Sequence, residues 1–176
     1  MLYTYKIEEA DLLTFQLYTS SKSVVLEKKK RNGRFILVAA SLAFGGYFLS
    51  SDEIPLGIYF CVMAIVSMVL YKRYFLWKHK LNYRRFIRAN YSSRFGMTET
   101  LETFPTHIFV KDKQGEGEVK REEFEGVVEI EKYFFLKMKS GTSLIIPKAQ
   151  VANDAFRNDL NKLKIPLVQE LSWSWG

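Results

Sequence analysis

Carboxylates are the side chains of this sequence that come closest to forming a chemical site. The cluster in residues 122–131 contains Glu122, Glu123, Glu125, Glu129 and Glu131. Paired carboxylates can act as general acid and base or bind a cation. On a strand, such a cluster more often forms the face exposed to water, and Lys132, Lys137 and Lys139 are spaced to pair with it across strands. We therefore expect a solvated acidic face, with a hydrolase using these carboxylates as the enzyme alternative.

Other residue types that carry chemistry are few and far apart. His79 and His107 fall in different predicted elements and have no partner at metal-ligand spacing. The single cysteine, Cys61, excludes a disulfide framework, and in apolar surroundings its thiol stays protonated and inert. The sequence contains no phosphate-binding loop and no nucleophile elbow. We therefore expect no catalytic residue, no metal site and no cofactor.

The distribution of charge is more informative than its total. The 176 residues carry 26 Lys and Arg against 19 Asp and Glu, a net charge of +7, and 48% of them are hydrophobic. This length fits one ordinary domain and excludes a large multidomain enzyme. The positive excess is concentrated in residues 27–34 and 72–94, which flank an apolar block. Although residues 74–91 mix aromatic and basic side chains as RNA-binding segments do, this flanking position argues against a nucleic-acid partner.

Two uncharged runs, residues 35–50 and 54–71, form the apolar block. As helices they would be roughly 24 and 27 Å long, close to the ~30 Å thickness of a bilayer core. Both are apolar on every face, and the rest of the chain is too short to bury them as a soluble hairpin. A cleaved signal peptide fits less well, because the first run starts far from residue 1. The sequence therefore predicts a transmembrane helical hairpin over residues 35–77.

Basic side chains border both predicted spans, and none lies in the turn between them. The positive-inside rule places both termini in the cytoplasm and the turn around Asp52 outside, so we expect a multi-pass membrane protein. Basic groups near an anionic leaflet gain about 1 kcal/mol each. The expected lipid-headgroup contacts are Lys28, Lys29, Lys30, Arg31, Arg34, Lys72, Arg73, Lys78, Lys80, Arg84, Arg85 and Arg88. Tyr71, Tyr74 and Trp77 are the expected aromatic residues of the membrane interface.

Small residues indicate where the two spans would touch, because they let helix backbones approach closely in lipid. The expected helix–helix packing residues are Ala39, Ala43, Gly46, Gly57, Cys61 and Ala64. Neither span contains an ionisable residue, which weighs against a transporter or a channel. A homo-oligomer formed through the hairpin remains an open alternative.

The chain outside the hairpin divides into three predicted segments. Residues 1–34 hold a strand followed by a juxtamembrane helix, and residues 78–95 continue the second span as a basic juxtamembrane helix. Residues 96–176 form a cytoplasmic domain. Its alternating runs predict strands at residues 97–103, 107–111, 117–121, 124–131, 133–139 and 143–146. A helix capped by Asn153 or Asp154 follows these strands and ends before Pro166.

This order of elements predicts the fold class. Antiparallel strands closed by one C-terminal helix are typical of a pleckstrin-homology-like (PH-like) barrel. We therefore expect an α+β protein in which the transmembrane hairpin is inserted in, or precedes, a PH-like antiparallel β-barrel or sheet.

Three stretches of sequence carry a resemblance to a known family: residues 3–7 (YTYKI), 124–136 (FEGVVEIEKYFFL) and 143–148 (SLIIPK). Together with the hairpin, they resemble the YcxB-like family of bacterial membrane proteins over nearly the whole chain. Family members commonly have a tryptophan shortly before the position of Phe124, where this chain has Lys120 and Arg121. The resemblance implies a PH-like cytoplasmic domain anchored in the bacterial inner membrane, and it carries over no catalytic residue.

The sequence thus favours a non-enzymatic membrane adaptor whose domain recognises a protein or a lipid headgroup close to the inner leaflet. The expected partners are membrane lipids and a protein of unknown identity. An immunity or stress protein that neutralises a membrane-active toxin is a more specific alternative. The enzyme alternative is a membrane-bound hydrolase that uses the carboxylates of residues 122–131. Trp173 and Trp175, near the C-terminus, could dock onto the domain or bind a partner.

Overall fold

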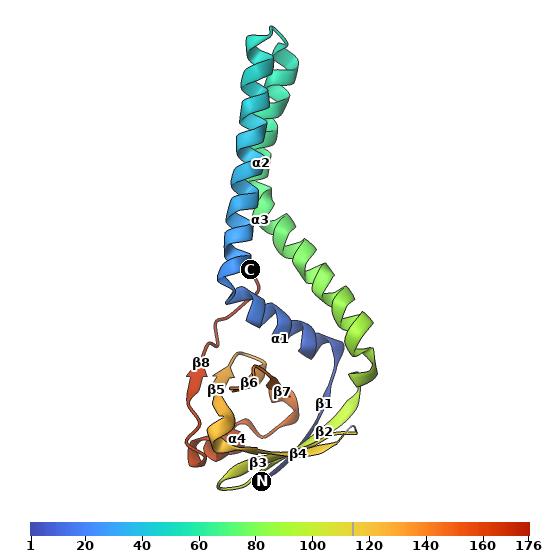
Figure 1. Ribbon diagram of the computed structural model, residues 1–176, viewed down its shortest axis with the longest axis vertical. Coiled ribbons are helices and arrows are strands. Elements are labelled where there is room, and N and C mark those ends of the chain that lie inside the picture. The colour runs from blue at the N-terminus through green and yellow to red at the C-terminus, as the bar shows by residue number, and fades with distance from the viewer. Residues whose placement is uncertain (114) are drawn as a thin grey trace. The chain divides into compact units, whose positions relative to one another are not determined.

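The computed structural model describes residues 1–113 and 115–176 and consists of two compact units (Figure 1). The first, which we call the β unit, comprises Met1–Gln16 and Arg84–Ser174. The second, the helical unit, comprises Leu17–Tyr83 and Trp175–Gly176. The architecture is α+β, with the helical unit inserted into the sequence of the β unit. The first residues of the chain and residues 84–95 therefore belong with the C-terminal part, instead of forming the separate segments expected.

Two long helices, α2 (Val24–Ser50) and α3 (Ile54–Tyr91), dominate the helical unit. The hydroxyl of Ser23 caps α2 by accepting a hydrogen bond from the Leu26 N–H at 3.4 Å. Between the helices, Asp52 adopts a φ of 61°, which aspartate tolerates better than most residues. Each helix is long and apolar enough to cross a membrane, and only 11% and 17% of their most apolar segments are buried in the structure. The basic stretch expected after the second span continues α3 as one helix.

The two helices pack through small residues, and the parts of them next to their connecting turn run side by side in Figure 1. A Cβ atom added at Gly45 would lie 3.1 Å from Cys61 Sγ and 3.4 Å from the carbonyl oxygen of Gly57. Phe60 stacks on Phe44 and Phe48 with ring centroids 5.5 Å apart in both pairs. These contacts bring the backbones together around Gly45, as small residues allow.

On α3, the packing residues expected from the sequence lie on this contact face: Gly57 and Ala64 are buried and Cys61 is half-buried. On α2 the contact face differs from the expected one. Ser41 and Gly45 are buried there, whereas Ala39, Ala43 and Gly46 are exposed. At 3.6 residues per turn, the two sets lie on nearly opposite sides of α2. The helix carries two stripes of small residues, and small size alone does not select between them.

The strands of the β unit form two four-stranded sheets. The first sheet is antiparallel and has the order β1 (Leu2–Ile7), β2 (Met97–Thr103), β3 (His107–Lys111), β4 (Glu116–Lys120). The second has the order β7 (Ser143–Pro147), β6 (Tyr133–Met138), β5 (Phe124–Glu129), β8 (Leu167–Gln169). Within the second sheet β8 runs parallel to β5, and the other pairs are antiparallel.

Among the described residues, these two sheets do not close into a barrel, so the expected closed PH-like barrel is not observed. The prediction assumed that successive strands pair throughout the domain. Instead, a short helical turn, Arg121–Glu123, separates β4 from β5, and the two strands do not pair. The N-terminal strand β1 adds to an edge of the first sheet and β8 to an edge of the second. Both sheets therefore keep open edges.

The core of the β unit surrounds β6, because two helices cover its two faces. Alternate residues of a strand point to opposite sides. Phe134 packs on Phe156 of α4 (Asn153–Lys162) with ring centroids 5.1 Å apart. Phe135 packs on Phe15 of α1 (Glu9–Ser21) at 5.2 Å. This double coverage explains why residues 133–136 are all buried.

Candidate functional site

A cavity of about 240 Å³, lined by both apolar and polar side chains, lies within the β unit. Three elements supply most of its apolar wall: Leu12 and Phe15 from α1, Phe86 and Ile87 from the end of α3, and Leu144 and Ile145 from β7. A small-molecule site usually combines such an apolar wall with a few polar groups that fix the orientation of the ligand. Glu99 and Arg94 bring polar groups to this cavity.

Glu99 is the buried acid of the cavity and is only 6% exposed. Arg94 Nη2 donates a hydrogen bond to Glu99 Oε1 at a long distance of 3.3 Å. Burial raises the pKa of Glu99 above its ordinary value, although the charge of Arg94 acts in the opposite direction. A hydrogen bond from the Tyr5 hydroxyl acts in the same direction as Arg94, so this buried carboxylate has donors from both residues.

Tyr5 lies next to Glu99, since the two residues are cross-strand neighbours of β1 and β2. Tyr5 is 1% exposed, and its hydroxyl donates to the Glu99 carboxylate with a geometry outside the usual range of hydrogen bonds. Burial, followed by the negative charge of Glu99, raises the pKa of Tyr5 well above its ordinary value. Buried polar groups in proteins are normally hydrogen-bonded, and these two pair with each other. Of the two, Glu99 lines the cavity.

Glu99 is not among the site residues predicted from the sequence, although a local signal is present. In strand β2, Glu99 and Leu101 share the face that turns to the core. A glutamate in the apolar phase of an alternating strand is exceptional, because burial of a charge costs free energy. The pattern could therefore have predicted a buried acid, but not the cavity beside it.

The acidic cluster of residues 122–131 does not come together. Its exposed members are Glu122, Glu123, Glu125 and Glu131. Glu129, by contrast, has 0% exposure, so the expected solvated face is wrong for this residue. Its side chain lies on the face of β5 that α4 covers, and none of the hydrogen bonds found for it comes from Lys132, Lys137 or Lys139.

Glu129 is held by a network of donors from three other elements. Arg157 donates from Nη2 at 2.6 Å and from Nε at 3.2 Å, Lys148 Nζ donates at 2.7 Å, and Gln169 Nε2 donates at 3.2 Å. The hydrogen bonds from Arg157, with those of Lys148, lower the pKa of Glu129 to about 2 even though burial opposes this. A carboxylate this well satisfied stays ionised and joins β5 to α4. Its role is structural.

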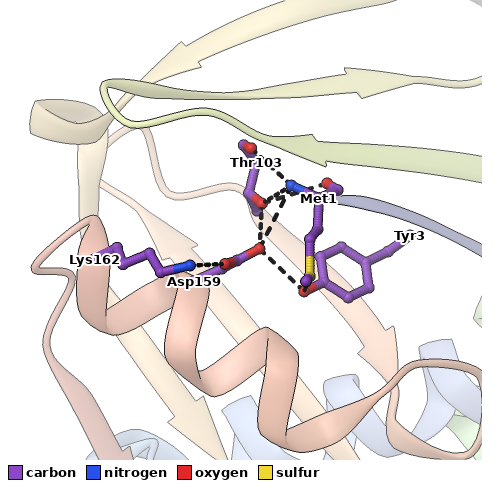
Figure 2. Close-up of polar contacts among 5 residues, drawn as sticks. All are labelled: Met1, Tyr3, Thr103, Asp159 and Lys162. Atoms are coloured by element: carbon purple, nitrogen blue, oxygen red, sulfur yellow. Dashed lines mark hydrogen bonds and ion pairs between the residues drawn. The ribbon is translucent and has the colours of Figure 1, made fainter.

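Asp159 of α4 forms a second polar cluster (Figure 2). Its Oδ2 accepts hydrogen bonds from the Thr103 hydroxyl at 2.6 Å and the Tyr3 hydroxyl at 3.1 Å, and Lys162 Nζ donates to Oδ1 at 3.1 Å. The α-amino group of Met1 donates to Thr103 Oγ1 at 2.8 Å. Burial acts to raise the pKa of Asp159, but the hydrogen bonds outweigh it and the pKa lies below its ordinary value. The cluster links β1 and β2 to α4.

Neither the histidines nor the C-terminal tryptophans are among the residues that line the cavity. His107 Nε2 lies 2.8 Å from Glu118 Oε1, and its ring stacks on Phe104. His79 contacts the ring of Phe75 within α3. Residues 1–113 and 115–176 contain no group of three His, Cys, Asp or Glu side chains placed to hold a metal ion. In the helical unit, the indole N–H of Trp175 donates to the Leu76 carbonyl at 3.4 Å.

Most of the basic residues expected to meet lipid headgroups are exposed on the helical unit. These are Lys28, Lys29, Arg31, Arg34, Lys72, Arg73, Lys78 and Lys80. Lys30 is half-buried and pairs with Glu27 at 2.6 Å. Arg84 and Arg88 instead belong to the β unit and pair with Glu9 at 3.3 and 2.8 Å, and Arg85 is exposed. Tyr74 and Trp77 are exposed and Tyr71 is half-buried.

Comparison with protein families gives one match, and it falls in the β unit. Residues 105–163, from just before β3 to the end of α4, match a family model. The model is that of the YcxB-like protein family, and we call residues 105–163, which are similar to it, the YcxB-like segment. The match confirms the resemblance drawn from the sequence over about a third of the chain and does not extend to the helical unit. Neither the curated proteins nor the solved structures that were searched gave a match.

The YcxB-like segment contains β7, which forms part of the cavity wall, and the Glu129 network apart from Gln169. Glu99, Arg94 and the residues contributed by α1 and α3 lie before it. The cavity therefore combines the YcxB-like segment with parts of the chain on its N-terminal side.

Proposed function

We propose that this chain is a non-enzymatic integral membrane protein. Its α2–α3 hairpin crosses the bilayer, and its β unit presents the cavity beside Glu99 to a partner on the cytoplasmic side. The observation that carries this proposal is the apolar surface of the hairpin, where Phe35, Ile65 and Val69 are 72%, 66% and 67% exposed. A soluble protein rarely exposes a contiguous apolar patch of more than a few hundred Å². Lipid is the solvent that matches such a surface.

The distribution of charge supports the same proposal. Residues 17–83 contain ten basic and three acidic side chains, so they account for the whole net charge of +7. Basic groups at the two ends of the hairpin and none in its turn are typical of a hairpin whose ends face the cytoplasm. The β unit is electrically balanced, with sixteen basic and sixteen acidic side chains. Attraction to anionic lipid therefore comes from the helical unit.

Binding, and not catalysis, is the activity that this geometry supports best. The carboxylates expected for a hydrolase are dispersed over the surface, apart from Glu129, which is fully bound by its partners. The cavity offers apolar side chains together with the polar groups of Glu99 and Arg94, a combination that suits recognition of a ligand. A protein side chain and a lipid headgroup both remain candidate partners, as does a bacterial inner-membrane location.

Extraction of the full chain from membranes tests the proposal. The wild-type chain should stay in the membrane pellet at alkaline pH and dissolve only with detergent. A variant with Ile65→Lys and Val69→Lys should lose membrane insertion, because each lysine at the centre of a span costs about 2.5–3.5 kcal/mol. Val168→Lys, at a similarly exposed apolar position of the β unit, is the matched control and should insert normally. A wild-type chain that dissolves in water would overturn the proposal.

A further inference from the structure

Both long helices of the helical unit bring positive charge to the end of the hairpin that is expected to face the cytoplasm. We infer that Lys29 of α2, together with Lys78 and His79 of α3, binds the phosphate of an anionic phospholipid in the cytoplasmic leaflet. The inference rests on the proposed membrane insertion of the hairpin and adds a second site, since none of these residues lines the cavity of the β unit.

Helices α2 and α3 stay in contact at the ends of their apolar runs. A Cβ atom added at Gly33 would clash with the hydroxyl of Tyr71. From Tyr71, half-buried rings continue along one face of α3, with centroids 6.0 Å apart for Tyr71 and Phe75 and 4.2 Å apart for Phe75 and His79. Lys29 precedes Gly33 by about one turn, so it lies on the side of α2 that makes this contact. Lys29 and His79 therefore approach each other from the two helices.

The charges that act on the imidazole of His79 are both positive, and they come from Lys29 and Lys78. Burial, followed by these two charges, lowers the pKa of His79 below its ordinary value, so the ring is neutral at pH 7. Both lysines are exposed, and none of the ion pairs found in residues 1–113 and 115–176 includes either of them. An anion between the two ammonium groups would turn their repulsion into attraction.

These groups lie at the depth of lipid headgroups. Along the helix axes, Lys29 is roughly 9 Å beyond the run that begins at residue 35, and His79 is roughly 12 Å beyond the run that ends at residue 71. The two runs are slightly shorter than the hydrocarbon core, and the headgroup region adds about 5–8 Å on each side. The long stem of a lysine covers the remaining distance. The indole of Trp175, which donates to α3 near this level, is of the type that settles at the membrane interface.

The class of lipid follows from the two positive charges. Phosphate oxygens accept hydrogen bonds from ammonium groups and from an imidazole N–H. Phosphatidylcholine carries its own ammonium group beside the phosphate, and Lys29 and Lys78 would repel it. Phosphatidylglycerol has the phosphate without that positive charge. The other exposed basic residues of the helical unit draw such anionic lipids toward the site.

Titration of short-chain lipids into the full chain in an uncharged detergent tests the inference. The probes are dioctanoyl-phosphatidylglycerol, dioctanoyl-phosphatidylcholine and inorganic phosphate. The imidazole signal of His79 in nuclear magnetic resonance spectra, assigned by its absence in His79→Gln, reports occupation of the site. Phosphatidylglycerol should shift this signal in a saturable manner and bind at least about tenfold more tightly than phosphatidylcholine. Inorganic phosphate should also bind at least about tenfold more weakly than phosphatidylglycerol, since it has no acyl chains to bury.

Three lysine variants locate the binding. Lys29→Gln and Lys78→Gln should each weaken the binding of phosphatidylglycerol by at least about fivefold, because each removes a charge-assisted hydrogen bond. Lys80→Gln is the matched control, since Lys80 is also an exposed lysine of α3 but is not among the charges that act on His79. It should change the affinity by less than about twofold.

Equal affinities for the two lipids would overturn the inference. Equal weakening in all three lysine variants would also overturn it, because the attraction would then be diffuse. Binding of inorganic phosphate as tight as that of phosphatidylglycerol would assign the site to a soluble anion. Alkaline extraction tests insertion of the hairpin alone, so an inserted chain without lipid preference contradicts this inference and leaves the membrane proposal standing.

Discussion

The two units of this chain handle apolar surface and charge in opposite ways. The helical unit leaves its large apolar side chains exposed and carries the whole net charge of +7 at its ends. The β unit buries its aromatic residues around β6 and balances its charges through ion pairs such as Arg157 with Glu129. Large apolar side chains thus indicate contact with lipid in the helical unit and a core that excludes water in the β unit. Burial, and not composition, makes this distinction.

This contrast predicts that one substitution has different consequences in the two units. Phe135→Ala, at a position with 0% exposure, should lower the free energy of unfolding of the β unit by about 3–5 kcal/mol, because it leaves a cavity. Phe35→Ala, at a position 72% exposed, is the matched control and should leave the β unit unchanged. Chemical denaturation in detergent, followed by near-ultraviolet circular dichroism, measures both. Equal losses of unfolding free energy in the two variants would contradict this contrast in burial between the units.

Glu129 should make the stability of the β unit depend on pH. Its pKa falls from 4.5 to about 2 on folding, so the carboxylate stabilises the fold fully above pH 4.5 and loses this effect as the pH falls to about 2. The shift corresponds to roughly 3 kcal/mol. Glu129→Gln should lower stability at pH 7 by a similar amount and flatten the acid limb of the stability profile.

Glu125→Gln, an exposed member of the same acidic cluster, is the control for this experiment. It should leave both the stability at pH 7 and the shape of the profile unchanged. An acid limb that persists in Glu129→Gln would assign the pH dependence to another group.

The hairpin offers a smaller effect with a closely matched control. Gly45→Val places a side chain against Cys61 and the backbone of Gly57, so it should destabilise the hairpin by about 1–3 kcal/mol. Gly46→Val has the same intrinsic helix propensity, but a Cβ atom at Gly46 meets nothing within 4 Å. The rate at which a thiol reagent modifies Cys61 should rise in the first variant only. A faster rate in Gly46→Val would indicate that α2 contacts α3 through the face of Ala39 and Ala43.

Local pattern predicted the elements of this fold better than it predicted their partners. Strands at residues 97–103 and 107–111 match β2 and β3, since alternation is a local signal. The pairing of β1 with β2 joins residues separated by the whole helical unit. Strand β8 is only three residues long and follows a proline, so its parallel pairing with β5 had no local signal. Because of these long-range pairings, the strands form two sheets and not the expected barrel.

The candidate site was predictable only in part, for the same reason. The sequence located the acidic residues but not which of them α4 would cover, and burial distinguishes Glu129 from the exposed Glu125. The cavity beside Glu99 is built from α1, the end of α3 and β7, which are distant in sequence. Such a site depends on tertiary packing, which periodicity does not reveal.

Chemical labelling of intact cells is the most direct test of a hairpin that crosses the membrane with both ends in the cytoplasm. In a Cys61→Ala background, Asp52→Cys places a single thiol in the turn between α2 and α3, and Glu125→Cys places one on the β unit. A membrane-impermeant maleimide should label the thiol at position 52 in intact cells and the thiol at position 125 only after lysis. Labelling of position 125 in intact cells, or protection of position 52, would contradict the account.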